Sequence, residues 1–349
     1  MSILSHLIAF SLTTMASISP AESAGVVKFY EIPSSSGASV SITSDSRGSI
    51  WFAQLNDNRL GMFNPKTKKF SYYDIPTARS FPTDLVAGNE NDIWFVEYDA
   101  NQLGRYDINK KTFDEFEIPT LKSQPYRLTV DKKGNVWFTQ FAGNKIGVYN
   151  REKNQFKEYP IPTPMSQPAG ITMDESGAVW FIEMQGNKLG KLLPESGTIT
   201  EYELPKPFSV PNELAVDGEG NLWLGARTGK KLMKFTPKSG HFEEFELPGK
   251  GVPEGLAVDG SGNIWYCDKF KNKVGRYSPK DGAFVEIDIA QSEGKPLDVT
   301  SRADKVWFTV MGTNQIGMID GGGVLSRQTP ELSVIINKKG NDLLKQLSH

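Results

Sequence analysis

Tryptophan recurs along the chain at an almost constant interval, and this period is the strongest constraint on the fold. Four successive intervals are 43 residues and the last two are 42. Self-similarity at this spacing is typical of repeat proteins in which each unit forms one supersecondary element. The repeated residues are Trp51, Trp94, Trp137, Trp180, Trp223, Trp265 and Trp307.

Each repeat contains four short segments with the pattern of β-strands. They are a Pro-led apolar segment (residues 125–131), a Trp segment (135–140), an Asn-Lys-Ile-Gly segment (144–147) and a segment ending in Pro (113–119 in the preceding repeat). All are short, β-rich runs bounded by turn residues. Four such strands per repeat predict an all-β, seven-bladed β-propeller with four-stranded blades.

Several repeated residues have structural interpretations. We expect the tryptophans to pack between blades, and the Asn and Gly of the third segment to be turn residues. The fifth repeat departs from this pattern, with Lys230 and Met233 in place of Asn and Gly.

The ring is expected to close through the N-terminal part of the chain. The fourth-strand pattern first occurs at residues 27–33, before the first Trp, and the last repeat has no good fourth strand after Asp320. The N-terminal strand should therefore join the last blade, which limits unpaired edges. We assign residues 24–320 to the propeller and 321–349 to a C-terminal tail.

Residues 1–23 have the pattern of a signal peptide. Leu7 to Ile18 is a short, uncharged, mostly apolar stretch, and residues 21–23 resemble a small-x-small cleavage site before Ala24. The n-region is atypical because no Lys or Arg precedes Lys28. We expect a periplasmic or secreted protein that is not inserted in the membrane after processing.

Charge and composition exclude several classes of function. With 39 basic and 41 acidic side chains, the chain has no electrostatic reason to bind nucleic acid. Cys267 is the only cysteine, so no internal disulfide and no Cys-based zinc site can form, and we expect it to be buried. The three histidines are His6, His241 and His349. We expect a monomer.

Two sets of variable positions should meet beside the central channel. The first and second strands of a blade are antiparallel, so the start of one and the end of the other share a face. Variation at fixed positions of a repeated frame is what a site grafted on a fold looks like. Two residues after the strand-one Pro, or at its equivalent, stand Ser41, Asp84, Arg127, Gly170, Glu213, Gly255 and Asp298. Three residues after Trp stand Gln54, Glu97, Gln140, Glu183, Ala226, Asp268 and Val310.

The candidate ligand-binding residues come from these sets and their neighbours. Carboxylates crowded there raise one another's pKa or recruit a hard cation such as Mg²⁺ or Ca²⁺. The candidates are Asp84, Glu97, Tyr126, Arg127, Glu183, Asn212, Glu213, Glu254, Asp268 and Asp298. Metal ligands could come from Glu97, Asn212, Glu213 and Asp298. The alternative is that these are solvated charges paired locally, with Arg127, Arg227 and Lys295 as counter-charges. Catalytic residues stay unassigned.

Residues 134–140, 144–147 and 158–162 resemble the repeat of the streptogramin (virginiamycin B) lyase family, as do residues 167–172 and 180–183. The resemblance runs from Val26 to Asp320 and implies a seven-bladed propeller. For the enzymes of the family it also implies Mg²⁺-assisted opening of a cyclic depsipeptide by elimination, with a histidine as general base.

The catalytic positions of that family do not carry over. Where the resemblance implies one histidine in the sixth unit and a second in the seventh, this chain has Glu254 and Leu297. The carboxylate implied after the seventh Trp is Val310 or Met311, and the one lyase-like aromatic residue, Tyr126, lies in the third unit instead of the first. Losing a general base alone removes ~10²–10⁴-fold of catalysis.

We therefore expect an exported β-propeller without streptogramin lyase activity, which binds a small polar molecule or a protein partner at the channel mouth. Arg127 is the expected contact for an anion. Three alternatives stay open: a divalent-metal-dependent hydrolase or lactonase, a divergent virginiamycin B-type lyase with Glu254 as base, and a pure interaction scaffold.

Overall fold

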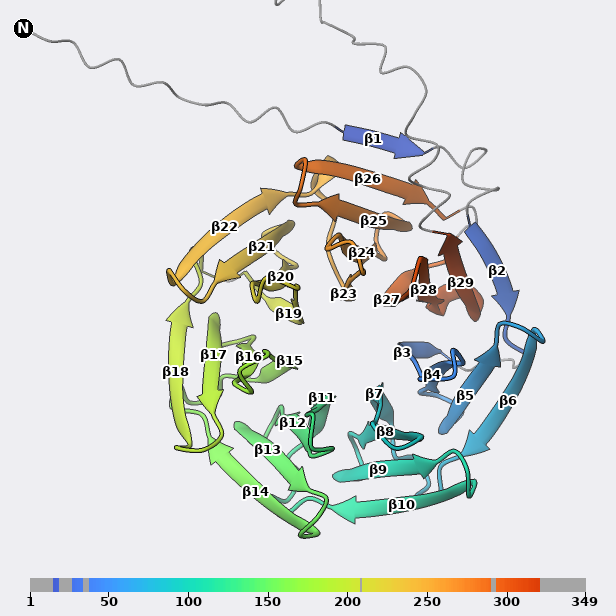
Figure 1. Cartoon of the computed structure of the whole chain (residues 1–349), viewed down its shortest axis with the longest axis vertical. Coiled ribbons are helices and arrows are strands. Elements are labelled where there is room, and N and C mark those ends of the chain that lie inside the picture. The colour runs from blue at the N-terminus through green and yellow to red at the C-terminus, as the bar shows by residue number, and fades with distance from the viewer. Residues whose placement is uncertain (1–14, 19–26, 34–37, 208, 290–292, 321–349) are drawn as a thin grey trace, which may run out of the picture.

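The computed structural model describes residues 15–18, 27–33, 38–207, 209–289 and 293–320, which form a ring of seven β-sheets (Figure 1). This confirms the seven-bladed β-propeller. The described part of the chain contains no α-helix, only the short 3₁₀ turns η1 (Pro248–Lys250) and η2 (Met311–Thr313). It contains no helix long and apolar enough to cross a membrane.

Within each blade the strands follow one another outward from the channel (Figure 1). The innermost strands are β3 (Ser39–Ser44), β7 (Pro82–Ala87), β11 (Pro125–Val130), β15 (Pro168–Met173), β19 (Pro211–Val216), β23 (Leu256–Val258) and β27 (Pro296–Arg302). The second strands are β4 (Ile50–Gln54), β8 (Asp92–Glu97), β12 (Val136–Gln140), β16 (Val179–Glu183), β20 (Leu222–Ala226), β24 (Ile264–Asp268) and β28 (Lys305–Val310). The third strands are β5 (Arg59–Asn64), β9 (Gln102–Asp107), β13 (Lys145–Asn150), β17 (Lys188–Leu193), β21 (Lys231–Thr236), β25 (Lys273–Ser278) and β29 (Gln315–Asp320). The outer strands are β6 (Lys69–Asp74), β10 (Thr112–Glu117), β14 (Gln155–Pro160), β18 (Thr198–Glu203), β22 (His241–Glu246), β26 (Ala283–Asp288) and, in blade seven, β2 (Val27–Glu31).

Strand β2 pairs with β29 in an antiparallel register, so the N-terminal strand closes the ring as predicted. One further strand was not predicted: β1 (Met15–Ile18) pairs in parallel with β26 and gives blade six a fifth strand. It falls inside the predicted signal peptide, whose other residues lie outside the described ones, as does the predicted tail, 321–349.

The repeated tryptophans join each blade to the next. All seven are between 0% and 4% exposed, which confirms that they pack inside the ring. In blade one, the Trp51 Nε1–H donates to Asp45 Oδ2 at 2.9 Å. Its ring lies 5.5 Å from Tyr73 in the outer strand and 5.7 Å from Tyr106 in the next blade. Burial of so large a side chain makes Trp→Ala changes cost about 3–5 kcal/mol.

The prediction for the Asn-Lys-Ile-Gly segment was right for Asn and wrong for Gly. Asn144 has a φ of +53° and lies in the turn before β13. Gly147, however, lies in the strand opposite Phe138, and a Cβ there would be 2.2 Å from the Cζ of that ring. The glycine makes room for the aromatic ring. In blade five Leu224 replaces the ring, and its partner is Met233.

Candidate functional site at the channel mouth

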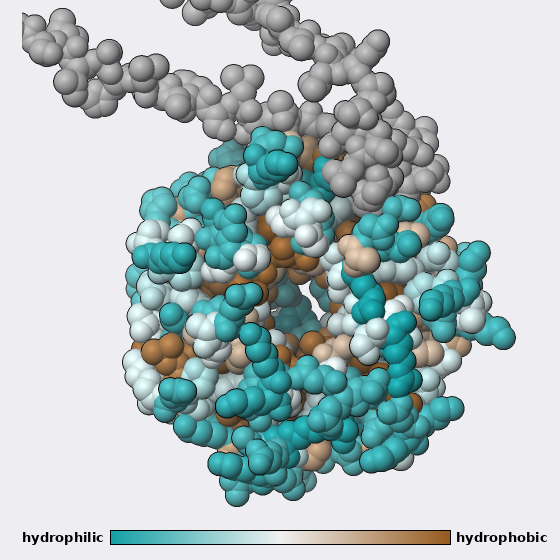
Figure 2. All heavy atoms as spheres, in the orientation of Figure 1, coloured by the Kyte–Doolittle hydropathy of each residue, from teal (hydrophilic) through white to brown (hydrophobic). Residues whose placement is uncertain are grey.

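Figure 2 shows the ring hollowed at its centre, with mostly hydrophilic side chains around the outer rim of the face in view. Six of the seven innermost strands begin with a β-bulge, β23 being the exception. In blade three, Pro125 pairs with Gln140, but regular pairing resumes only at Leu128; the same shift occurs in blades four, five and seven. A bulge frees residues from the ladder and redirects their side chains. In these four blades the freed residues are the first and second after the Pro. In blades one and two only one residue is freed, and Ser41 and Asp84 pair with Ala53 and Val96.

At two bulges, a threonine hydroxyl of the second strand accepts a hydrogen bond from a backbone N–H that the bulge frees from the ladder. The N–H of Arg127 donates to Thr139 Oγ1 and that of Asp298 to Thr309 Oγ1, both at 3.1 Å. Both threonines are fully buried. Sequence reasoning missed them, although each stands two residues after its Trp.

Five residues of the first predicted set come together, and we call them the channel cluster: Ser41, Asp84, Arg127, Glu213 and Asp298. The Arg127 guanidinium pairs with the Glu213 carboxylate and lies 3.7 Å from Asp84 Oδ1. Ser41 Oγ–H donates to Asp84 Oδ1 at 2.7 Å. Arg127 is thus held between carboxylates that come from blades far apart in the sequence.

Two of these carboxylates also tie neighbouring blades together. Asp84 Oδ2 accepts a hydrogen bond from the N–H of Leu128 at 3.0 Å, and Asp298 Oδ2 accepts one from the N–H of Ile42 at 2.9 Å. Where the set has glycine, the neighbouring blade leaves no room for a side chain. A Cβ on Gly255 would lie 2.6 Å from the Cα of Asp298.

The charged side chains of the channel cluster are largely buried, with Arg127, Asp84 and Glu213 only 14–15% exposed, and this burial shifts their pKa values. Burial raises the pKa of Asp84, and raises that of Asp298 to about 6. Burial also raises the pKa of Glu213, with Arg127 opposing this effect. For Arg127, burial disfavours the charge, but Glu213 and Asp84 outweigh it and raise its pKa well above the usual value. The guanidinium therefore stays charged among carboxyl groups that hold protons more readily than they would in water.

Aromatic side chains adjoin Arg127 and form what we call the aromatic ledge: Phe81, Tyr98, Tyr126 and Phe141. The guanidinium lies 5.0 Å from the Tyr126 ring centroid, within cation–π range. Tyr126 is 6.2 Å from Tyr98 and 5.4 Å from Phe141, and Tyr98 is 6.2 Å from Phe81. Only Tyr126 was named from the sequence. Tyr98 and Phe141 each directly follow a residue of the second set, which is the signal that could have found them.

The second predicted set is placed differently. Glu97, Glu183 and Asp268 are fully buried. Glu97 and Glu183 lie near the outer-strand residues Glu115 and Glu201, and Asp268 accepts hydrogen bonds from adjacent loops, so none of the three joins the channel cluster. Burial, with Glu115 nearby, raises the pKa of Glu97 to about 8. Burial, with Glu201 nearby, does the same for Glu183.

The equivalent residue of blade three shows how these two buried glutamates can be accommodated. In blade three the same position is Gln140, whose Nε2–H donates to Glu158 Oε1 at 2.9 Å. A protonated glutamic acid can donate to the outer-strand carboxylate as that amide does. Asp268, in turn, accepts from the N–H of Lys271 at 3.0 Å and from that of Val252 at 3.2 Å.

Glu254 forms a second charged group. It is 2% exposed, and its Oε1 lies 2.9 Å from Arg227 Nη2 and 3.0 Å from Lys269 Nζ. Arg227 is thus a counter-charge, as the local-pairing alternative expected. Lys295 instead pairs with exposed Glu293 at 3.0 Å.

The four residues considered as metal ligands do not form one group. Glu213 and Asp298 belong to the channel cluster, whereas Glu97 lies against Glu115 in its own blade. Asn212 is 6% exposed, and its Oδ1 has no hydrogen-bond partner among the described residues. Within those residues, no three or more His, Cys, Asp or Glu side chains are arranged to hold a metal ion.

Two other reactive side chains lie apart from the cluster's chemistry. Cys267 is fully buried as predicted, and burial raises the pKa of its thiol well above the usual value. His241 is exposed at the start of β22, an outer strand, and is the one histidine among the described residues.

Comparisons with known proteins agree with this fold. The family model described as "Virginiamycin B lyase family" matches residues 6–168 and 137–331. A search of curated proteins finds no match. Among solved structures, the virginiamycin B lyase from Staphylococcus aureus is 28% identical, with a TM-score of 0.80 over 84% of this chain and 98% of that one.

Two further structures extend the comparison. A catalytically inactive histidine-to-alanine variant of the S. aureus enzyme, solved with quinupristin, is 27% identical, with a TM-score of 0.80 and the same coverage. The extracellular domain of the putative hybrid two component system BT4673 from B. thetaiotaomicron is 17% identical; its TM-score is 0.67, over 84% of this chain and 42% of that one, and it shows the fold alone. Because the family model spans nearly the whole propeller, the chain belongs to the virginiamycin B lyase family.

Proposed function

We propose that this chain is a ligand-binding member of the family, without lyase activity, which takes a small polar molecule at the channel mouth. The observation that carries the proposal is the channel cluster lying directly beside the aromatic ledge. A charged, largely buried group next to an aromatic surface is the usual composition of a small-molecule site.

Unsatisfied polar atoms indicate what the ligand would supply. Arg127 Nε is buried and has no hydrogen-bond partner among the described residues, and the same holds for Asn212 Oδ1. An orphaned buried donor or acceptor costs about 1–3 kcal/mol. A ligand with a carboxylate or carbonyl group for Arg127 Nε–H and a planar group for Tyr126 would recover the energy lost at that donor and extend the cation–π contact.

The residues at the lyase positions support binding over elimination. Glu254, which stands where the resemblance implies a histidine, is engaged by both Arg227 and Lys269 and so is poorly placed to accept a proton from a substrate. Leu297 and buried Val310 can neither accept a proton nor bind an ion. The residues present therefore do not fit the Mg²⁺ that the resemblance implies, and we assign no step to that ion.

A thermal-shift screen of small carboxylates, sugars and peptides, with Ca²⁺ and Mg²⁺ run separately, tests the proposal. A ligand at ~100 times its Kd should stabilise the wild type by about 2.7 kcal/mol. The shift should be lost in Arg127→Met and in Tyr126→Ala but kept in Lys295→Met, the matched control, because that lysine pairs outside the cluster.

Other outcomes would favour the alternatives. A shift with Ca²⁺ or Mg²⁺ that Glu213→Gln and Asp298→Asn abolish would replace the proposal with a metal-dependent hydrolase or lactonase. No shift with any compound would contradict small-molecule binding and favour a protein partner.

We also propose that the protein is exported, on the pattern of residues 1–23. N-terminal sequencing of the chain recovered from the periplasm or medium should begin at Ala24. Recovery of the intact N-terminus from the cytoplasm alone would contradict export.

A further inference from the structure

A hollow of about 370 Å³ opens on the channel-mouth face at the junction of blades five and six, and we call it the lysine hollow. It lies between the turn that joins β20 to β21, the loop from β22 to β23 and the turn that joins β24 to β25. Its lining includes Lys230, Lys250 and Lys271, with Phe270 beside them. The volume is in the range of small-ligand sites.

At the other six junctions an asparagine side chain holds the loop between the blades. Asn101 is typical, because its Nδ2–H donates to the carbonyl oxygens of Ile118 and Thr120, both at 3.1 Å. Its Oδ1 accepts from the N–H of Ser123 at 2.7 Å. The asparagines that donate in the same way to the following loop are Asn58, Asn144, Asn187, Asn272 and Asn314.

Blade five has Lys230 at this position, with a φ of +55° like that of the asparagines. A lysine ammonium has no acceptor atom, so it cannot replace the asparagine amide. The loop that follows is also one residue shorter than at the other junctions, with Gly251 where Ser123 stands. Asp268 holds this loop instead, since its Oδ2 accepts from the N–H of Val252 at 3.2 Å. The Lys230 side chain therefore has no part in holding the loop and is available to a ligand.

The positive charge of the lysine hollow is not neutralised by its own lining. Lys230 and Lys250 form no ion pair among the described residues, and Lys271 Nζ–H donates to a neutral group, the carbonyl oxygen of Gly249. Asp268 is the one carboxyl group in the lining, and its oxygens accept hydrogen bonds from backbone N–H groups. Each ammonium has three N–H donors. The lining thus has a surplus of positive charge and of hydrogen-bond donors, which is the composition of an anion site.

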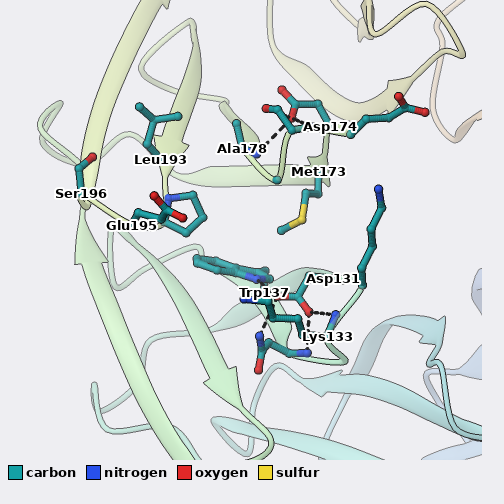
Figure 3. A pocket seen from close by; sticks show the side chains of 15 residues that line it. Asp131, Lys133, Trp137, Met173, Asp174, Ala178, Leu193, Glu195 and Ser196 are labelled. Carbon is teal, nitrogen blue, oxygen red and sulfur yellow. Dashed lines mark hydrogen bonds between the residues drawn. The ribbon is translucent and has the colours of Figure 1, made fainter.

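A larger hollow, of about 650 Å³, lies between blades three and four on the opposite face and shows the contrast (Figure 3). Its charged residues are of both signs: Asp131, Lys132, Lys133, Asp174, Glu175 and Glu195. Two of its carboxylates hold their own turns, because Asp131 Oδ1 accepts from the N–H of Lys133 at 2.8 Å and Asp174 Oδ1 from that of Ala178 at 3.1 Å. Of these two hollows, the lysine hollow is the one that concentrates charge of one sign.

We propose that the lysine hollow binds a phosphate monoester that carries a planar ring. A phosphate monoester has a charge near −2 at pH 7 and three acceptor oxygens, which match three ammonium groups better than a carboxylate does. The ring would lie against Phe270, which is 68% exposed. None of these residues belongs to the channel cluster or the aromatic ledge, so this proposal stands or falls independently of the proposed function.

Isothermal titration calorimetry of the full chain with phenyl phosphate tests the proposal. Inorganic phosphate, which lacks the ring, and phenol, which lacks the charge, are the comparison probes. Phenyl phosphate should bind about threefold to tenfold tighter than inorganic phosphate, as one aromatic contact requires, and phenol should not bind. The affinity for phenyl phosphate should fall between pH 7.5 and pH 5, because the phosphate takes up its second proton near pH ~6.

Variants separate the contributions of the charge and the ring. Lys230→Asn installs the residue that the other six blades have, so it should fold, and it should weaken the binding of both phosphates about tenfold or more. Lys250→Gln should have the same effect. Phe270→Ser should remove the advantage of phenyl phosphate and leave the binding of inorganic phosphate unchanged.

Lys122→Asn is the matched control. Lys122 is exposed on the loop between blades two and three, so this substitution changes the net charge as Lys230→Asn does but should leave both affinities unchanged. Thermal unfolding reports that each variant is folded.

Four results would overturn the proposal. They are no heat of binding with millimolar phenyl phosphate, an unchanged affinity in folded Lys230→Asn, an equal loss of affinity in Lys122→Asn, and binding of phenol as tight as that of phenyl phosphate.

Discussion

Replacing Glu183 with glutamine should stabilise the protein relative to the wild type, by an amount that grows as the pH rises. Glu183 was one of the candidate ligand-binding residues predicted from the sequence. In the folded chain burial raises its pKa to about 8, with Glu201 nearby. Blade three already has a glutamine at the equivalent position, Gln140, which donates to Glu158. Glu183→Gln should therefore fit without rearrangement.

The sign and the size of this difference in the free energy of unfolding follow from proton linkage. The unfolded chain releases the proton near pH ~4.3, whereas the folded chain keeps it until about pH 8. Between these values the folded state holds more protons, so the wild-type free energy of unfolding falls as the pH rises, by about 1.4 kcal/mol per pH unit for this one carboxyl group. Glutamine does not titrate and removes this loss. The advantage of Glu183→Gln should approach about 5 kcal/mol by pH 8 as an upper bound.

Urea unfolding of both proteins at pH 5, 6, 7 and 8, followed by tryptophan fluorescence, measures this difference. Glu203→Gln is the matched control, because that side chain is on the same blade but 75% exposed, so its effect should stay within about 0.5 kcal/mol. A stability difference between Glu183→Gln and wild type that does not change with pH would refute the reasoning. Glu97→Gln should behave like Glu183→Gln.

Three other substitutions test the packing of the ring and its cluster. Gly147→Met should cost about 3 kcal/mol or more because it meets the Phe138 ring, and adding Phe138→Leu, which recreates the pair of blade five, should restore part of that loss in thermal unfolding. Gly255→Ala should cost about 1–3 kcal/mol, whereas Gly218→Ala, which meets nothing within 4 Å, should stay within about 0.5 kcal/mol. Arg127→Met should cost about 3–5 kcal/mol at pH 8, where it leaves buried carboxylates unpaired, and less at pH 5, where they bind protons; equal losses at both pH values in urea unfolding would contradict this.

The fold was predictable because a single residue type marks each repeat. The spacing of the tryptophans determined the number of blades, and the early copy of the fourth-strand pattern, at residues 27–33, determined how the ring closes. Strand β1 was not predictable, since Met15–Ile18 belongs to no repeat and its parallel pairing with β26 depends on the tertiary structure.

The candidate site was predictable in part, because the position of a residue along a strand does not determine where its side chain points. Arg127, Glu213 and Asp298 are freed from the ladder by β-bulges, and Asp84 directly follows one, so these side chains converge at the channel. Glu183 lies in regular pairing at the end of β16, and its side chain lies near Glu201 of the outer strand. A bulge cannot be recognised from one repeat unit alone.

The central claim, a family member that binds without lyase chemistry, is tested most directly by incubating the protein with quinupristin and Mg²⁺ and separating the products by liquid chromatography. Separation is needed because an elimination that opens the ring leaves the mass unchanged, and the S. aureus virginiamycin B lyase serves as the positive control. We predict that the compound stays cyclic with the wild type. Ring-opened product that forms with the wild type but not with Glu254→Gln would contradict the account and identify Glu254 as the base of an active lyase.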